Sequence, residues 1–443
     1  MVIEPTISNA RGYRDPVDNV EDLNDVNVFA PNEMLTPGTI RVDDPIRSAI
    51  AAKQSSHIVP VENAVPSLVS NGYDEAVQFH LSDDFVINAE EDGKVLDVNE
   101  EVGFVMVEYK SGKRKAIPLK PEIVKNSGAG FYLSNQLKPV HTKVGEKFKK
   151  DEPLAYHPRY FNYSKLNGLR FTLGPLCKVA LCSSYNTYED AGLCTESLSE
   201  RMKSSIVYME AGKFKKNHNI SYMVKVGDHV NIGDSLIKFD TSVDDNELAK
   251  YLTKLNDENA DMLAEENRND VKTMHAGTVV DIKVYTLLPP ESLSPSLGKI
   301  VQNYFDAAEN KKKFLEKYDS SEGIIKAGYM MTDSTEPIKD RYHSIKGHKG
   351  IDVLIEIYIE HGELMGVGDK VALYGPNKQI ISEVIPKGWE PYSEFRPDEE
   401  ISVICSPGTL ARRMVSSSVC IIAAGKVLVE LKRAVKDMIK FSK

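Results

Sequence analysis

Residues 367–378, VGDKVALYGPNK, contain the pattern that decides the fold class of this chain of 443 residues. Gly368 stands before an acidic residue, which predicts a tight turn because glycine readily adopts left-handed backbone angles. The apolar residues on either side favour short β-strands, and the following Gly-Pro pair predicts a second turn. The stretch therefore predicts a small β unit in which Lys370 and Lys378 lie near a turn.

The same phrase occurs twice more, as VGEKFKKDEPLAY at residues 144–156 and as VGDHVNIGDSLIKF at residues 226–239. The copies are irregularly spaced, so they indicate several small β modules and not a tandem repeat. Short apolar stretches at 86–98 and 104–109, followed by a basic turn at 109–115, extend the β pattern. We therefore expect a mixed, β-rich multidomain fold.

Two stretches have a helical pattern instead. Residues 243–271 are acidic and carry Leu248, Leu252 and Leu255 at positions i, i+4 and i+7. Residues 298–318 are the second candidate. We expect both to be helical insertions between β modules. The leucine stripe of the first either docks a partner or packs on its own domain.

The bulk composition limits the class of protein. Hydrophobic residues make up 41% and charged residues 27%, which is typical of globular domains. The net charge of −10 argues against a nucleic-acid binder that acts alone, although it allows one wall of a larger channel. The absence of a long apolar run and of a secretory pattern predicts a cytoplasmic protein. Five cysteines without a Cys-x-x-Cys pair predict reduced thiols and no zinc site.

Residues 185–191, YNTYEDA, place two carboxylates side by side, Glu189 and Asp190. Hard cations prefer oxygen ligands, so this pair either orders the waters of a hydrated Mg²⁺ or is solvated surface. Lys370 and Lys378 have two interpretations as well. They either meet successive phosphates, at roughly 1.5–3 kcal/mol for each charge-assisted contact, or are exposed loop lysines.

Residues 406–414, SPGTLARRM, contain two neighbouring arginines whose planar guanidinium groups suit phosphate. The sequence leaves open whether Arg412 or Arg413 makes that contact. The basic run at 339–349 either lines a nucleic-acid channel or is a solvated loop. Residues 43–60, DDPIRSAIAAKQSSHIVP, form a fourth motif, which begins with an acidic pair and contains Arg47, Lys53 and His57.

Together and in this order, the four motifs resemble the C-terminal part of the β subunit of multisubunit DNA-dependent RNA polymerases. The resemblance extends over about residues 40–430. The chain departs from the family at 373–376, where Leu-Tyr-Gly-Pro replaces Gly-Arg-His-Gly, and at Lys53 and His57, where Asn and Gln are usual. The residues that match the family motifs are Asp43, Asp44, Arg47, Val59, Pro60, Glu189, Asp190, Asp369, Lys370, Asn377, Lys378, Pro407, Arg413 and Met414.

The resemblance implies a double-psi β-barrel catalytic core with sandwich/barrel-hybrid modules, a flap-like domain and helical insertions. It implies these consecutive segments: an extended N-terminal arm at 1–40, a β-subunit core at 41–200, a flap-like domain with the acidic helix at 201–275, a connecting segment with a helical insertion at 276–335, a barrel region at 336–430 and a C-terminal helix end at 431–443.

The resemblance also implies a reaction, the template-directed addition of ribonucleotides with release of pyrophosphate. In this reading Lys370 and Lys378 neutralise phosphates, and Arg413 with Arg47 orients the triphosphate. Glu189 and Asp190 assist the second Mg²⁺ indirectly. The remaining contacts to nucleotide or RNA come from Lys53, His57, Asn377 and Arg412.

The implied enzyme needs other chains. The main Mg²⁺ site of the family belongs to an Asp-Phe-Asp-Gly-Asp triad, which this sequence lacks, so we expect the chain to be inactive alone. The expected partners are an N-terminal β-like subunit, a β′-like subunit with the triad, a promoter-specificity factor at the flap-like region, template DNA, nascent RNA and NTPs, but no membrane. The divided β subunit resembles the split polymerases of giant bacteriophages, which predicts the cytoplasm of an infected bacterium or the virion as its location.

Two other classes of function compete with this one. A non-catalytic virion or scaffold protein, built from carrier-like β modules, would use the same Val-Gly-Asp turns. A self-sufficient phosphotransferase is less well supported, because the sequence has no GxxxxGK phosphate loop.

Overall fold

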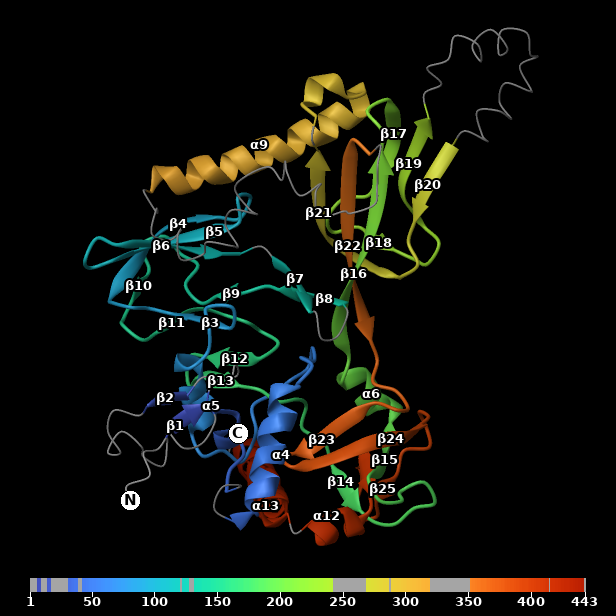
Figure 1. Ribbon diagram of the computed structural model, residues 1–443. Helices are drawn as coiled ribbons and strands as arrows, with labels where there is room; N and C mark the ends of the chain where they lie inside the picture. The colour runs from blue at the N-terminus through green and yellow to red at the C-terminus, as the bar shows by residue number, and fades with distance from the viewer. Residues whose placement is uncertain are drawn as a thin grey trace, which may run out of the picture. The chain divides into compact units, whose positions relative to one another are not determined.

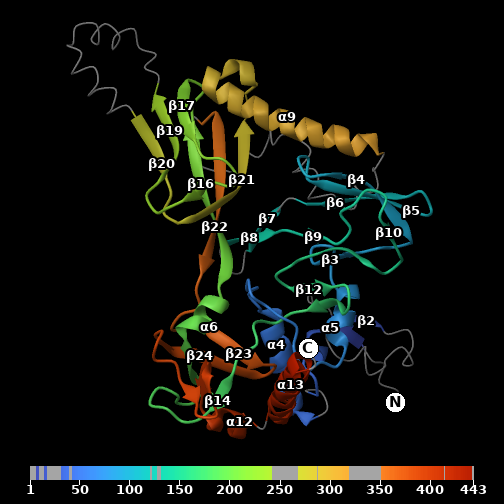
Figure 2. The same cartoon turned by 180° about the vertical axis from the view of Figure 1, so that it is seen from behind.

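The computed structural model describes residues 6–8, 14–16, 31–38, 42–119, 122–126, 131–241, 268–286, 288–318, 351–413 and 415–441. The fold is mixed and β-rich, as the sequence predicts, and the chain forms two compact units (Figures 1 and 2). Unit 1 comprises Met1–His80, Arg159–Lys203 and Leu364–Lys443, whereas unit 2 comprises Leu81–Pro158 and Ser204–Glu363. Each unit is therefore assembled from separate stretches, and the consecutive segments that the resemblance implies stay predictions.

Unit 2 is built on a six-stranded sheet in the order β18-β21-β22-β16-β8-β7. Its centre is an antiparallel ladder in which β16 (Ser204–Phe214) and β22 (Val353–Glu363) pair without interruption. The β-branched side chains of β22 are fully buried, which suits a central strand covered on its core face. The other strands are β7 (Glu122–Asn126), β8 (Phe131–Asn135), β18 (His229–Val230) and β21 (Gly277–Thr286).

One long helix, α9 (Pro295–Lys317), packs on the core of this sheet and confirms the second predicted helix. Ser294 caps its start, because the Ser294 side chain accepts a hydrogen bond from the backbone N–H of Leu297. Leu297 and Val301 are fully buried against the sheet. A short 3-10 helix, η3 (Pro290–Ser292), precedes it.

Smaller sheets complete unit 2. The predicted strands at 86–98 and 104–109 are present, and the predicted basic turn joins β5 to β6. A four-stranded sheet has the order β10-β4-β5-β6, and three-stranded sheets have the orders β3-β11-β9 and β17-β19-β20. Their strands are β3 (Val86–Asn88), β4 (Gly93–Asn99), β5 (Phe104–Tyr109), β6 (Arg114–Pro118), β9 (Lys138–Pro139), β10 (Lys147–Phe148), β11 (Pro153–Tyr156), β17 (His218–Met223), β19 (Ser235–Thr241) and β20 (Arg268–Lys272).

Strand β20 corrects the prediction of a helix at 243–271. Most of that stretch, including its three leucines, lies outside the described residues. Its last residues, from Arg268 to Val271, are extended and pair with β19, where Val271 faces Ile237. The prediction is wrong there because cross-strand pairing with a neighbouring strand overrides weak local helix propensity.

The recurring Val-Gly-acidic phrase forms the same turn three times, as predicted. Gly145, Gly227 and Gly368 have φ angles of 82°, 96° and 95°, which favour glycine. The acidic side chain that follows accepts a hydrogen bond from a backbone N–H three residues earlier, as in Lys225 N to Asp228 (2.7 Å). At the third copy, Gly366 N donates to Asp369 Oδ2 at 2.8 Å.

Unit 1 is organised around a mixed five-stranded sheet in the order β14-β27-β15-β24-β23. Strands β14 and β27 are parallel, as are β15 and β24, whereas β15 with β27 and β23 with β24 are antiparallel. One face of the sheet is covered by an apolar cluster that includes Cys194, Leu198 and Val403. The strands are β14 (Val179–Leu181), β15 (Ala191–Thr195), β23 (Lys370–Tyr374), β24 (Asn377–Ile385) and β27 (Val403–Cys405).

Helices and small hairpins surround this sheet. No helix among the described residues is long and apolar enough to cross a membrane. The helices are α2 (Pro31–Met34), α4 (Pro45–Ser56), α5 (Tyr73–Ala76), η2 (Val77–Phe79), α6 (Glu196–Arg201), α12 (Pro407–Arg413) and α13 (Ser416–Phe441). The hairpins pair β1 (Thr6–Ser8) with β2 (Arg14–Pro16), β12 (Phe161–Ser164) with β13 (Gly168–Phe171), and β25 (Tyr392–Ser393) with β26 (Arg396–Glu400).

Candidate functional site

The two predicted lysines lie on one face of the β23–β24 hairpin in unit 1. Lys370 faces Ile380, and Lys378 faces Ala372 across the antiparallel ladder. Cross-strand partners point to the same side, so both lysines share a face at diagonal positions, about 7–8 Å apart at the backbone. Ile380, the cross-strand partner of Lys370, is half exposed, Lys370 is exposed and Lys378 is half-buried. The face is thus open to a ligand.

Neither lysine is neutralised within the described part of the chain. Most of the other cations of unit 1 with a hydrogen bond or ion pair, such as Lys178 and Lys387, contact carboxylates. No ion pair or side-chain hydrogen bond involves Lys370 or Lys378 in those described ranges. In a protein with a net charge of −10, two adjacent unpaired ammonium groups form a local anion-attracting surface.

The acidic pair lies at the neighbouring strand of the same sheet. Glu189 and Asp190 end the turn before β15, and the N–H of Ile380 donates to the carbonyl oxygen of Asp190 at 2.8 Å. Since Ile380 also pairs with Lys370, the acidic turn lies two strand spacings, about 10 Å, from that lysine. Glu189 has a φ of 52°, which is unusual for a residue with a side chain.

The structure distinguishes the two arginines that the sequence could not orient. Arg413 is largely buried and forms an ion pair and hydrogen bond with Asp190. Arg412 is exposed, and its Nη1 lies 3.8 Å from Oε1 of Glu189. The hydroxyl of Thr409 also donates to the carbonyl oxygen of Glu189. Helix α12 therefore holds the acidic turn in place, and the two motifs form one structural element.

The first motif, 43–60, is tied to the same unit through its two aspartates. Asp43 accepts hydrogen bonds from the backbone N–H (2.9 Å) and the hydroxyl of Ser417, at the start of α13. Asp44 caps α4, because its Oδ1 accepts from the N–H of Ile46 at 2.7 Å. Both aspartates thus have structural roles that fix the helix carrying the candidate contact residues.

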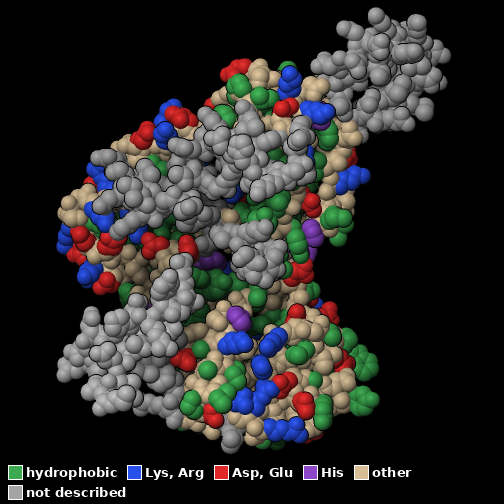
Figure 3. Space-filling view, viewed as in Figure 1, with side chains coloured by type: hydrophobic (Ala, Val, Ile, Leu, Met, Phe, Trp, Pro, Cys, Tyr) green, Lys and Arg blue, Asp and Glu red, His purple; other side chains and the backbone are tan. Residues whose placement is uncertain are grey.

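Helix α4 carries Arg47 and Lys53, and His57 is its C-terminal cap. Lys53 and His57 are exposed, whereas Arg47 is half-buried. The loop before α4 packs on the β23–β24 turn, where a Cβ at Gly375 would clash with Thr36. Figure 3 shows Lys and Arg side chains gathered over the part of unit 1 that carries α4 and the β23–β24 hairpin.

The structure does not bring Asn377 to the lysine face. Asn377 is buried on the opposite face of β24, beside Gln379, and both are about 1% exposed. Oδ1 of Asn377 and both amide atoms of Gln379 lack a hydrogen-bond partner in the described part of the chain, as does Nη1 of Arg413. Buried polar groups without partners are unusual. The sequence analysis did not identify Gln379. The only signal for it is that Gln379 follows Lys378 in a strand, so its side chain points to the opposite face.

The acidic pair does not form a magnesium site by itself. Both carboxylates are ion-paired with arginines, and no group of three or more His, Cys, Asp or Glu side chains in the described ranges is arranged to hold a metal ion. Mg²⁺ usually needs several oxygen ligands or phosphate oxygens to complete its shell. The arrangement therefore allows at most an indirect role for Glu189 and Asp190.

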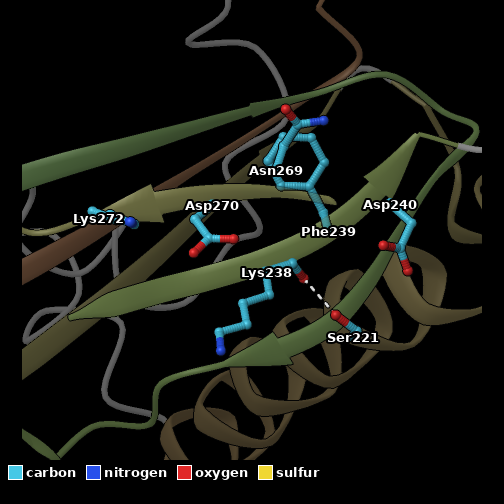
Figure 4. A pocket seen from close by; sticks show the side chains of 7 residues that line it. All are labelled: Ser221, Lys238, Phe239, Asp240, Asn269, Asp270 and Lys272. Carbon is cyan, nitrogen blue, oxygen red and sulfur yellow. Dashed lines mark hydrogen bonds between the residues drawn. The ribbon is translucent and has the colours of Figure 1, made fainter. Parts of the chain in front are cut away.

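An open hollow of about 720 Å³ lies elsewhere, on the β17-β19-β20 sheet of unit 2 (Figure 4). Lys238 and Lys272 line it together with Asp240 and Asp270, so its charges are balanced. It contains none of the predicted site residues. The predicted basic run at 339–349 and Met414 lie outside the described residues.

Comparisons with known proteins provide no independent identification. No protein-family model matches the chain, and no curated protein matches it.

Proposed function

We propose that this chain is a β-like subunit, corresponding to the C-terminal part of β, of a DNA-dependent RNA polymerase. One observation carries the proposal. Four motifs from distant parts of the sequence lie in one unit, and hydrogen bonds or strand pairing join residues 43–60 to α13, 185–191 to β24 and 185–191 to α12. A set of unrelated surface features would not be expected to converge in this way.

In the proposed reaction, the exposed lysine face binds phosphate. Lys370 and Lys378 neutralise the phosphates of the RNA 3′ end or the incoming nucleotide. Arg413 acts first as a positioning residue, because it holds Asp190 and the acidic turn. The guanidinium group of Arg412 is exposed and is the one accessible to triphosphate oxygens, whereas the unpartnered Nη1 of Arg413 is buried. Arg47, Lys53 and His57 extend the contact surface along α4 toward nucleotide and RNA.

The partner chains would complete the enzyme. The Mg²⁺ ions, supplied on the metal-bearing β′-like subunit and with the nucleotide, would activate the attacking hydroxyl and stabilise the leaving phosphates. We propose that the five-stranded sheet of unit 1 contributes to a double-psi β-barrel. We also propose that the β17-β19-β20 region has a flap-like role and binds a promoter-specificity factor. A separate N-terminal β-like subunit would be a further partner. The proposed setting is transcription by a giant phage, in the host cytoplasm or the virion.

The decisive test removes both charges of the lysine face. Lys370→Ala with Lys378→Ala should lower RNA synthesis by the assembled complex at least roughly tenfold, since a decade in rate corresponds to about 1.4 kcal/mol. Assembly should be unaffected because the face is exposed. Template-directed RNA synthesis and co-purification of the subunits are measured in parallel.

The matched control is Lys165→Ala with Lys440→Ala, which removes two exposed lysines of unit 1 outside the motifs. This control should retain full activity. If the Lys370/Lys378 variant also retains full activity in a correctly assembled complex, the active-site assignment is wrong, and the non-catalytic virion or scaffold function becomes the better explanation.

A further inference from the structure

Helix α13 buries Ser417, Ser418 and Ile421 in its first half, whereas its second half turns its polar side toward its own unit. Arg433 forms an ion pair with Glu399, and Arg396 contacts Glu430 at 2.8 Å. Lys426 and Arg433 also contact Glu430, at 2.7 and 2.8 Å. These charged groups attach the helix to strand β26 by its hydrophilic face. A surface helix usually does the opposite and buries its apolar stripe.

The opposite side of α13 carries an apolar stripe that faces away from unit 1. Its members follow a spacing of three and four residues, so they fall on one side of the helix over more than three turns. Their exposed fractions are large for side chains of this kind. The stripe consists of Val427 (66% exposed), Leu428 (37%), Leu431 (57%), Val435 (46%), Met438 (64%) and Ile439 (54%).

The helix is not free to bury this stripe by rotating in place. Rotation would break the contacts that Glu430 and Arg433 make with β26 and would place those charges in solvent or against apolar groups. Residues 434–440 are all exposed and lie beyond the contacts with β26 in the sequence. The described part of unit 1 therefore leaves the apolar stripe uncovered.

The charges beside the stripe indicate what that partner is. Lys432 and Lys436 lie along one edge of the stripe, and neither has an ion-pair partner in the part of the chain that the structure describes. Asp437 and Glu430 lie along the other edge. We propose that α13 docks into an apolar, helix-lined groove of another protein chain, with acidic side chains facing Lys432 and Lys436.

A second copy of this chain fits the stripe less well. Residues 416–441 contain five basic side chains and two acidic ones, so two copies of α13 would bring like net charges together. An anionic membrane also fits less well, because Asp437 and Glu430 border the stripe on its other edge. The stripe is wider than the apolar seam of a two-stranded coiled coil, so it suits a groove between two helices. The inference depends on the proposed function only in that the chain works within a multisubunit assembly.

The experiment places a photo-crosslinking amino acid on the stripe in the assembled complex. Leu431 and Met438 are replaced one at a time, and Lys440, on the hydrophilic side, is the control position. Crosslinks from both stripe positions, and not from position 440, should join one partner chain at an apolar helical segment with neighbouring acidic residues. Crosslinks to a second copy, to lipid, to another part of the same chain, or to nothing would overturn the proposal.

A pair of substitutions tests the consequence for assembly. Leu431→Lys with Met438→Lys should lower the assembled fraction at least roughly tenfold, while circular dichroism and urea unfolding of the isolated chain stay unchanged. Val419→Lys introduces the same charge at an exposed apolar residue of α13 outside the stripe, and assembly should survive it. Full assembly of the double variant would refute the docking role. RNA synthesis by the wild-type complex, measured separately, shows whether the polymerase proposal itself holds.

Discussion

Units 1 and 2 differ in how their secondary structure relates to function. Unit 2 is organised by long antiparallel ladders, and its largest core cluster is apolar and closely packed. Unit 1 has a small mixed sheet, an acidic turn, two unpaired lysines and a helix with an exposed apolar side. Local features that conflict with simple folding rules gather at functional sites. We therefore propose that unit 1 provides the nucleotide contacts, and that the large sheet of unit 2 is mainly scaffold.

The largest expected effect on stability is in the core of unit 2. Ile357→Ala removes a fully buried side chain of β22 and should lower the free energy of unfolding by about 2–5 kcal/mol. The same change at the half-exposed Ile380 of unit 1 should cost less than about 1 kcal/mol. Hydrogen exchange followed separately in each unit measures both. Similar losses at the two positions would remove the distinction between scaffold and contact surface.

The second prediction concerns close packing beneath the lysine face. In Gly192→Ala the new methyl group would clash with Oε1 of Gln379, so unit 1 should lose about 1–3 kcal/mol of stability. Gly425→Ala in α13 meets no neighbouring atom and should be neutral or stabilising by about 1 kcal/mol. Adding Gln379→Ala to Gly192→Ala should recover most of the loss. Failure of that recovery, measured by urea unfolding, would mean that Gln379 is not the close neighbour.

The third prediction uses thiols as reporters of unit 1, which contains all five cysteines as free thiols, in agreement with the sequence. Burial raises the pKa of Cys194 to about 11 and also raises the pKa values of Cys177 and Cys405. Cys182 and Cys420 are exposed. A thiol reagent at pH 8 should therefore label two cysteines quickly and three slowly, because only the thiolate reacts. Five equally fast thiols would show that unit 1 is open in solution.

The smallest expected effect is a pH dependence in unit 2. A hydrogen bond from Tyr318, with Lys317 nearby, lowers the pKa of Asp97 against the opposing effect of burial. Because the pKa of Asp97 is lower in the folded state, its carboxylate stabilises the fold at pH values above the ordinary carboxyl pKa of about 3.8. This contribution is lost as the pH falls below that value and through the folded pKa. Tyr318→Phe should remove about 1 kcal/mol or less at pH 7 and show a weaker loss upon acidification. Identical acid unfolding curves for both proteins would contradict this role of Tyr318.

Several features could be read from the sequence because they depend on local chemistry. The Val-Gly-acidic turns, the α9 helix and the hairpin at 109–115 follow from glycine conformation, capping and alternation of apolar residues. The common face of Lys370 and Lys378 follows from strand periodicity once the turn is known. The β-rich class was predictable because glycine turns and short apolar stretches recur along the chain. The polymerase resemblance, in contrast, rests on motifs and stays a proposal.

Other features depend on contacts between residues far apart in the sequence. The extended conformation of 268–271 comes from pairing with β19, and Asn377 is buried on the face of β24 opposite the lysines. Arg413 and Arg412 differ only because α12 points one of them at Asp190.

The sequence by itself determined where the Val-Gly-acidic turns and several strands of this protein lie, and which residues are chemically suited to phosphate. Only the tertiary structure decided which side of α13 faces outward and which charges are already paired. The physical reason is that turn and strand preferences arise within a few residues, whereas burial and charge neutralisation depend on Glu399, Asp190 and other partners that the folded chain brings from a distance.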